Sequence, residues 1–233
     1  IGIGRIDKSQ ITRLISGMTE WLSACNCILA GGETAEMPGI VPDGMIELSG
    51  FAIGAVEKKD LINPERVEVG DVLIGYPSDG FHANGWSLVR RVLRENPGEF
   101  SPEEIKELLA PTRLYHEEVA ALKTAGADIK AMAHITGGGL LDNVPRILQT
   151  GLQACLHRDA WQMPRLFSWM QQQGGVADSE MHRVFNCGIG MVMVVPADKA
   201  EAIAAALRGR GESVHTLGEI RACGASDPQT IVD

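Results

Sequence analysis

Residues 31–39 read GGETAEMPG, and this stretch is the most informative part of the chain. It follows an apolar run at 27–30, which predicts a strand that ends where the glycines begin. Glycines let a backbone approach a ligand closely, and carboxylates beside them suit a hard cation such as Mg²⁺ on a nucleotide phosphate. A tight turn that carries two solvated acids is an equally good interpretation of these residues alone.

The composition is ordinary for a globular protein, and it does not exclude a phosphorylated small substrate. The chain has 233 residues, 45% of them hydrophobic, and a net charge of -9 that argues against a nucleic-acid partner. No apolar run approaches the roughly 18–20 residues of a membrane span, and no signal peptide begins the sequence. The five cysteines form no CxxC pair, which favours reduced thiols in the cytoplasm. The chain begins without Met, so we expect a fragment of a longer protein.

The first 58 residues predict one helix and two strands. Asp7 can cap a helix to about Ser23, because apolar residues recur at helical spacing between them. Strands are predicted at 27–30 and 46–56. The polar stretch 58–70 is the best domain boundary.

The remaining residues predict a series of strands and helices that are mixed without strict alternation. Strands are expected at 71–76, 129–135, 152–156, 188–195, 213–220 and 230–232. Helices are expected at 86–94, 102–109, 112–122, 139–148 with a bend at Pro145, 164–170, 179–184 and 197–207. This pattern favours an α+β fold, with mixed α/β layers, over a doubly wound sheet.

Three loops share one chemical character, since each follows a predicted strand and combines glycine with polar groups. They span residues 31–39, 78–85 and 134–139. Backbone N–H groups at the start of a helix bind phosphate in this kind of arrangement. None of the three is a P-loop or a dinucleotide fingerprint.

Two histidines lie in these loops. His82 lies between Gly80 and Asn84, and His134 precedes the Thr136–Gly139 run. A neutral imidazole there could donate to a phosphate or act as acid or base near pH 7, but a structural histidine that bonds a loop carbonyl is the more frequent case. Arg113 could likewise pair with a phosphate or form an ordinary ion pair. Cys187 is interpreted as a buried structural thiol.

Five motifs, taken in order, resemble one enzyme family. They are GGETAEMPG at 31–39, SDGFHANGWSLVR at 78–90, LLAPTRLY at 108–115, AHITGGGLLDNVPR at 133–146 and FNCGIGMVMVVP at 185–196. The chain is similar through them to aminoimidazole ribonucleotide synthetase, also called phosphoribosylformylglycinamidine cyclo-ligase. The likeness runs from about residue 4 to residue 220. A wider superfamily with related ATP-binding domains includes thiamine-phosphate kinase and selenophosphate synthetase.

The resemblance implies a reaction in purine biosynthesis. ATP would phosphorylate the formyl oxygen of formylglycinamidine ribonucleotide, a ring nitrogen would attack that carbon, and the imidazole would close. The implied cofactors are ATP and Mg²⁺. The implied catalytic residues are His82 and His134. The implied cofactor- and substrate-binding residues are Gly31, Gly32, Glu33, Thr34, Asn84, Thr136, Gly137, Gly138 and Gly139, with Glu33 also as metal ligand.

The resemblance also implies a domain organisation. Residues 1–58 would be the remaining C-terminal part of an ATP-binding and dimerisation domain, and residues 68–233 a complete C-terminal synthetase domain. The resemblance implies a longer N-terminal domain with further acids for metal and ATP. Because the family dimerises through sheets of that first domain, the full-length parent is expected to be a homodimer. Two alternatives stay open: a non-catalytic module that binds nucleotide or phosphate, and a superfamily kinase acting on another phosphorylated small molecule.

Overall fold

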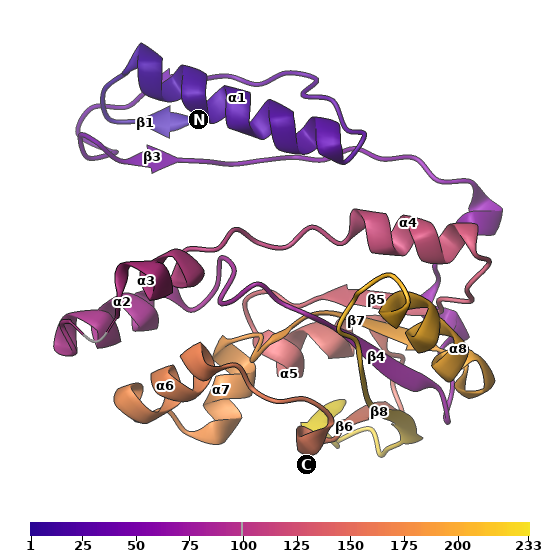
Figure 1. Ribbon diagram of the computed structural model, residues 1–233. Coiled ribbons are helices and arrows are strands. Elements are labelled where there is room, and N and C mark those ends of the chain that lie inside the picture. The colour runs from indigo at the N-terminus through magenta and orange to yellow at the C-terminus, as the bar shows by residue number, and fades with distance from the viewer. Residues whose placement is uncertain (99) are drawn as a thin grey trace. The chain divides into compact units, whose positions relative to one another are not determined.

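Two units, residues 1–60 and 61–233, make up the chain (Figure 1). The computed structural model describes residues 1–98 and 100–233. The N-terminal unit contains the helix α1 (Lys8–Ala24) and a three-stranded sheet in the order β2-β1-β3. Its strands are two residues long each, at β1 (Gly2–Ile3), β2 (Ala35–Glu36) and β3 (Ile46–Glu47). The short 3₁₀ turn η1 (Lys58–Asp60) ends this unit.

The helix α1 begins where the sequence predicts it. The Asp7 carboxylate accepts hydrogen bonds from the backbone N–H groups of Ser9 at 2.8 Å and Gln10 at 3.2 Å. These bonds satisfy two of the N–H groups that the first turn of any helix leaves without a partner. No residue of α1 is fully buried, so its N-terminal boundary is specified by this local contact.

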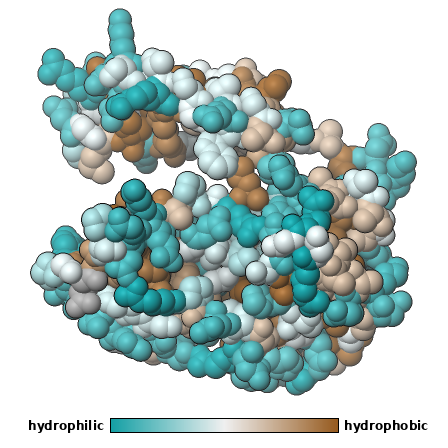
Figure 2. Space-filling view, in the orientation of Figure 1, coloured by the Kyte–Doolittle hydropathy of each residue, from teal (hydrophilic) through white to brown (hydrophobic). Residues whose placement is uncertain are grey.

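Two predicted strands in the N-terminal unit are wrong. Residues 27–30 have no regular secondary structure, and only Ile46–Glu47 of the predicted strand 46–56 is a strand. A strand needs a neighbour to accept its backbone hydrogen bonds, and no neighbour is paired with residues 27–30 or 48–56 in the described part of the chain. Their apolar side chains lie on the surface, where Phe51 is 92% and Ile53 90% exposed. In Figure 2, which colours hydrophobic residues brown, such residues are visible on the surface of the N-terminal unit at the top of the view.

The second unit is built on a six-stranded sheet in the order β5-β7-β4-β8-β6-β9. All neighbouring strands are antiparallel except the parallel pair β6 and β9. The strands are β4 (Val72–Pro77), β5 (Ala131–His134), β6 (Leu152–Leu156), β7 (Ile189–Val195), β8 (His215–Ala222) and β9 (Thr230–Val232). They confirm the six strands predicted for this unit.

Alternate residues of the sheet pack on opposite faces. Leu73 packs with α5 (Gly139–Asn143) and the 3₁₀ helix η3 (Val144–Ile147), whereas its neighbour Ile74 packs with α4 (His116–Thr124) and α8 (Ala197–Arg208). Each central strand is buried on both sides, because successive side chains of a strand point to opposite faces. The α+β fold with mixed layers is thereby confirmed.

A third cluster gathers the remaining helices at one end of the sheet (Figure 1). It contains the helices α2 (Trp86–Glu95), α3 (Pro102–Leu108), α6 (Arg165–Gly174) and α7 (Asp178–Val184). At its centre, the Phe81 ring lies 4.6 Å from the Phe167 ring and 5.1 Å from the Phe185 ring, measured between centroids. Aromatic rings bury a large apolar area in such contacts, so this cluster fixes the loop that carries Phe81.

One helix of this unit starts later than predicted. The sequence places a cap at Thr112, but α4 begins at His116 and the preceding residues are not helical. The backbone N–H of Arg113 bonds the His82 ring, so this segment is held away from helical geometry. The predicted bend at Pro145 is confirmed as the change from α5 to η3. The turns η2 (Pro64–Arg66) and η4 (Arg158–Ala160) complete the unit. No helix in the described ranges is both long and apolar enough to span a bilayer.

Candidate functional site

Two of the three predicted loops meet at one edge of the large sheet. β4 and β5 both run antiparallel to β7, so they are parallel to each other and their C-terminal ends share that edge. The loop 78–85 leaves β4 there and the loop 134–139 leaves β5 there. A methyl group on Gly137 would lie only 3.6 Å from the Asn84 Oδ1 atom. The sheet therefore brings the two loops into contact.

The glycine loop 136–139 is held by one buried asparagine. The Nδ2 atom of Asn143 donates to the carbonyl oxygens of Gly139 at 2.8 Å, Gly137 at 3.2 Å and Thr136 at 3.3 Å. The Thr136 hydroxyl donates to the Asn143 Oδ1 atom at 3.1 Å. Because these carbonyl oxygens are bound from the Asn143 side, the loop has a fixed shape rather than that of a free turn.

Gly139 has no room for any side chain. Its φ angle is +57°, and a Cβ atom would lie 2.1 Å from the His182 carbonyl oxygen and 2.7 Å from that of Phe185. Both neighbours are backbone atoms of the α7 region, which cannot rotate away. The close approach is possible only for glycine, and it fixes the loop against α7.

Asn186 ties the other loop to the start of β7. Its side chain is fully buried, and its Oδ1 atom accepts from the Ser78 hydroxyl and from the Gly188 N–H, both at 2.8 Å. Its Nδ2 atom donates to the Gly80 carbonyl oxygen at 2.9 Å. Asn186 is not among the site residues that the sequence predicts. The available signal was an amide side chain directly before the residues Cys-Gly-Ile-Gly, within one of the five motifs.

His82 is buried inside this edge and has an unusual backbone. Its φ angle is +54°, in the left-handed region that residues other than glycine seldom adopt. Its Nε2 atom accepts from the backbone N–H groups of Asp79 at 3.1 Å and Arg113 at 3.3 Å. Burial is the main reason that the pKa of His82 falls to about 4, and the positive charges of His134 and Arg113 add to it. The ring is therefore neutral near pH 7, with its proton on Nδ1.

His134 lies at the end of β5 and is exposed, unlike His82. Its ring centroid lies 6.3 Å from that of His82 and 6.0 Å from that of Tyr115. Although the residue as a whole is exposed, its neighbours remove part of the water around its ring, and this desolvation lowers the pKa of His134 below its usual value. The Tyr115 hydroxyl donates to the Pro77 carbonyl oxygen at 2.9 Å, so this ring is fixed beside the histidine. Of the two predicted catalytic histidines, His134 is the one whose side chain is open to solvent.

Arg113 and Cys187 are occupied by structural contacts. The Arg113 guanidinium bonds Glu118 at 2.8 Å and also pairs with Glu212, which leaves little of it for a phosphate. The Cys187 Sγ atom donates to the Met181 carbonyl oxygen at 3.3 Å, and burial raises the pKa of this thiol to about 12. The structure confirms that Cys187 is a buried, unreactive thiol.

The third predicted loop belongs to the N-terminal unit. Gly31, Gly32, Glu33 and Thr34 are exposed, and the Glu33 carbonyl oxygen accepts from the amino group of Ile1 at 2.8 Å. Within residues 1–98 and 100–233, no three His, Cys, Asp or Glu side chains are grouped so that they could hold a metal ion. Glu33 is therefore a single carboxylate, and a Mg²⁺ ion beside it would need other oxygen ligands, such as phosphates and waters.

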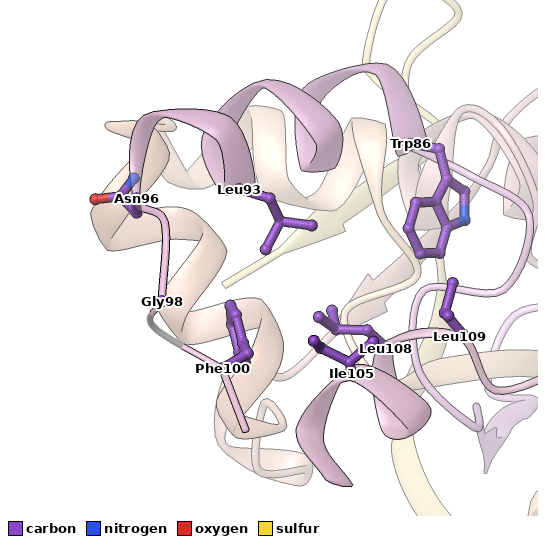
Figure 3. A pocket seen from close by; sticks show the side chains of 8 residues that line it. All are labelled: Trp86, Leu93, Asn96, Gly98, Phe100, Ile105, Leu108 and Leu109. Atoms are coloured by element: carbon purple, nitrogen blue, oxygen red, sulfur yellow. The ribbon is translucent and has the colours of Figure 1, made fainter. Parts of the chain in front are cut away.

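A separate pocket of about 280 Å³ lies between α2 and α3 (Figure 3). Its walls are mainly apolar, and Figure 3 shows Leu93, Phe100 and Ile105 directed toward its interior. The Trp86 indole also lines it, and the Trp86 Nε1 atom donates to the His82 carbonyl oxygen at 2.7 Å. Among the described residues that line the pocket, none is acidic and none is a histidine.

Residues 68–229 match the family described as "AIR synthase related protein, C-terminal domain". Over 235 residues the chain is 52% identical to the phosphoribosylformylglycinamidine cyclo-ligase of Bordetella petrii, covering 98% of this chain and 67% of that protein. The chain spans about two thirds of the length of the curated relatives that it matches.

Solved structures with the same fold are more distant in sequence. The thiamine-monophosphate kinase from Stenotrophomonas maltophilia K279a aligns with a TM-score of 0.65 at 15% identity, over 100% of this chain and 69% of that chain. The hydrogenase maturation protein HypE in complex with ATP aligns with a TM-score of 0.67 at 16% identity, over 97% of this chain and 66% of that chain.

Proposed function

The chain belongs to the AIR synthase related family, and on that premise we propose that it forms the greater part of an ATP-dependent cyclo-ligase. The substrate would be formylglycinamidine ribonucleotide and the product aminoimidazole ribonucleotide, a step of purine biosynthesis. The observation that carries the proposal is the contact between the loops 78–85 and 134–139, where Asn84 lies beside Gly137. This contact gathers polar and glycine residues of both motifs at one edge of the sheet.

The proposed chemistry follows from the poor leaving ability of an amide-type oxygen. ATP supplies the phosphoryl group that turns the formyl oxygen into a phosphate ester. A nitrogen of the same substrate then attacks the formyl carbon, the imidazole ring closes, and inorganic phosphate departs with that oxygen. The protein has to hold the two reacting atoms close together and to accept one proton as the ring closes.

Residues of the second unit fit these tasks. Asn84 and the N–H groups of the loop 136–139 would bind phosphate oxygens, because glycine lets the backbone approach them. The exposed imidazole of His134 would take the proton released on ring closure. Asn143 and Asn186 hold the two loops by hydrogen bonds to the carbonyl oxygens of Gly139 and Gly80. The groups that would bind phosphate are therefore preorganised before the substrate arrives.

The N-terminal unit would supply part of the ATP site. In this proposal Gly31, Gly32 and Thr34 approach the nucleotide, and Glu33 is one of several ligands to a Mg²⁺ ion bound with it. The ATP complex of HypE, which shares the fold, supports a nucleotide in this family of structures. Residues 1–58 would then be part of a larger ATP-binding domain through which a cytoplasmic homodimer forms, and residues 68–233 the C-terminal domain.

A paired assay of ADP and inorganic phosphate on the full-length gene product tests this function. With formylglycinamidine ribonucleotide and ATP, a cyclo-ligase releases both products in equal amounts and only when the substrate is present. A kinase of the same superfamily would release ADP while the phosphate stays on its product. A non-catalytic binding module would release neither, and either result would refute the proposal.

A pair of asparagine variants locates the site. Asn84→Ala should lower kcat/KM by about tenfold or more, because a misplaced substrate loses the advantage of fixed geometry. Asn96→Ala is the matched control, because Asn96 lies at the other end of α2 and its Nδ2 atom donates to the Val92 carbonyl oxygen of the same helix, at 2.9 Å. Equal losses in the two variants would show that Asn84 has no specific place in the site.

A further inference from the structure

We propose that His82 is a positioning residue, whose imidazole latches the loop 78–85 onto the segment 110–115 and so holds Asn84 against the glycine loop 136–139. The inference rests on the function proposed above, because it assigns a task to one residue of that site. It differs from the sequence-based role of His82, which was acid–base catalysis. The proton-transfer role then belongs to His134 alone.

The geometry at His82 is that of a residue held from several sides. The ring accepts from the N–H groups of Asp79 and Arg113, and the His82 carbonyl oxygen accepts from the Trp86 indole at 2.7 Å. These three bonds hold a backbone in the left-handed region, which a residue other than glycine adopts at a cost. Such strain persists only where the surroundings over-determine the conformation.

The two N–H donors lie 34 residues apart in the sequence, at positions 79 and 113. A single ring nitrogen therefore joins the loop after β4 to the segment before α4. The second donor is itself fixed, since the Arg113 side chain is paired with Glu118 and Glu212. The latch thus connects the site loop to an anchored ion-pair cluster.

Gly190 of β7 leaves the space in which the ring lies. A Cβ atom on Gly190 would lie 2.9 Å from the His82 Cε1 atom and 1.9 Å from the Tyr115 hydroxyl oxygen. The ring is therefore packed against the strand, and its side chain is enclosed rather than directed to solvent. A proton carrier needs to reach the atom that it serves, whereas a latch needs only its backbone partners.

The charged and titratable groups around the ring agree with a neutral latch. Burial is the largest influence that disfavours a positive charge on His82, His134 and Arg113 act in the same direction, and Asp79 opposes them. Protonation would place a proton on Nε2, where both N–H groups already point. The latch would then open, because a protonated nitrogen accepts no hydrogen bond.

Two substitutions separate the latch from proton transfer. In His82→Gln the carboxamide oxygen stands as many bonds from Cβ as Nε2 does, so it can accept from both N–H groups but cannot carry a proton near pH 7. In His82→Asn the amide is too short to reach, although asparagine tolerates the left-handed backbone well. His82→Gln therefore keeps the latch together with the backbone strain, whereas His82→Asn removes the latch and relieves the strain.

The test measures amide hydrogen exchange at Asp79 and Arg113, together with kcat/KM across pH in the full-length gene product. We expect His82→Asn to speed exchange at both amides by about tenfold and to lower kcat/KM by a similar factor, mainly in kcat. His82→Gln should recover most of the protection and of the activity, with an unchanged pH profile.

Two outcomes would overturn the latch. Equal losses in His82→Gln and His82→Asn, with the acid limb of the pH profile gone in both, would mean that His82 carries a proton. Unchanged exchange in both variants would mean that no latch exists. If the variants fail to fold, the ¹⁵N shifts of His82 in the unmodified chain decide, since the latch requires the proton on Nδ1. An unmodified protein without substrate-dependent ADP release would refute the proposed function and leave the exchange test intact.

Discussion

The N-terminal unit and the second unit use apolar residues in opposite ways. In residues 61–233, three clusters bury apolar side chains on both faces of a six-stranded sheet and beside it. In residues 1–60 the large apolar side chains of Ile28, Phe51 and Ile53 are 86%, 92% and 90% exposed. Among residues 1–60, all of which the structure describes, the buried apolar side chains are those of Ile3 and Val41.

The difference shows which elements can form from local contacts. The helix α1 forms with no fully buried residue, because Asp7 satisfies its first N–H groups from the adjacent position. The strands of the same unit shrink to two residues, because a strand depends on partners that are distant in sequence. An apolar run in the sequence therefore forms a full strand in the second unit, where it has neighbouring strands, and at most two strand residues in the first.

The largest expected difference between the two units comes from replacing one phenylalanine by alanine in each. Phe167→Ala removes a fully buried ring from the third cluster and should cost about 3–5 kcal/mol of the free energy of unfolding. Phe51→Ala removes an exposed ring and should change it by less than about 0.5 kcal/mol. Denaturant unfolding followed by tryptophan fluorescence measures both. Similar losses would mean that Phe51 is buried in solution.

The next largest effect should come from acid, which should lower the free energy of unfolding of the second unit and leave the first unit unchanged. All six histidines lie beyond residue 60, and the pKa values of His82, His134 and His182 are lowered mainly by burial. A histidine whose pKa is lowered by folding binds fewer protons in the folded state than in the unfolded state. Its contribution to the free energy of unfolding is therefore fully present above pH 6.5 and is lost as the pH drops toward 4.

For His82 this loss should reach about 2 kcal/mol by pH 5, given its pKa of about 4 and an unfolded value near 6.5. Denaturant midpoints of the second unit between pH 7.5 and 5 measure it, and His82→Gln should flatten the slope. The amide protection of α1 should stay constant over that range. A slope that is unchanged in His82→Gln would show that other groups cause the acid sensitivity.

The smallest effect should be confined to one turn of α1. Asp7→Ala removes the acceptor of the Ser9 and Gln10 N–H groups, so exchange at these two amides should quicken while the second unit keeps its denaturant midpoint. Asp7→Asn is the matched control, because asparagine caps helices about as well as aspartate. A shift of the second unit's midpoint would mean that the two units are coupled.

The sequence predicts the elements of the second unit well, for a physical reason. Strands such as β4 and β7 are buried on both faces, so their apolar runs are continuous and end at glycine or proline. The start of α4 is missed because Thr112 is a good cap by local rules, whereas Arg113 is held by a histidine that is distant in sequence. Only tertiary structure shows that contact.

The candidate site also contains some residues that the sequence reveals and others that only the structure reveals. The loops around Asn84 and Gly137 are visible as glycine and polar residues after predicted strands, and the structure places them together. Asn143 and Asn186, which hold those loops, are not visible, because a buried amide in a sequence resembles any surface asparagine. His82 is visible as a histidine in a glycine-bounded loop, but its enclosure follows from the absent side chain of Gly190.

The buried amide of Asn186 has a consequence for how this protein is made. Asn186 lies 108 positions after Ser78 and 106 positions after Gly80, the two residues of the loop that its side chain binds. A ribosome therefore releases the loop 78–85 long before the residue that secures it has been translated. Until Asn186 has been made, the Ser78 hydroxyl and the Gly80 carbonyl oxygen lack the partner that they have in the folded chain, so this loop cannot reach its final shape before the later part of the chain is present.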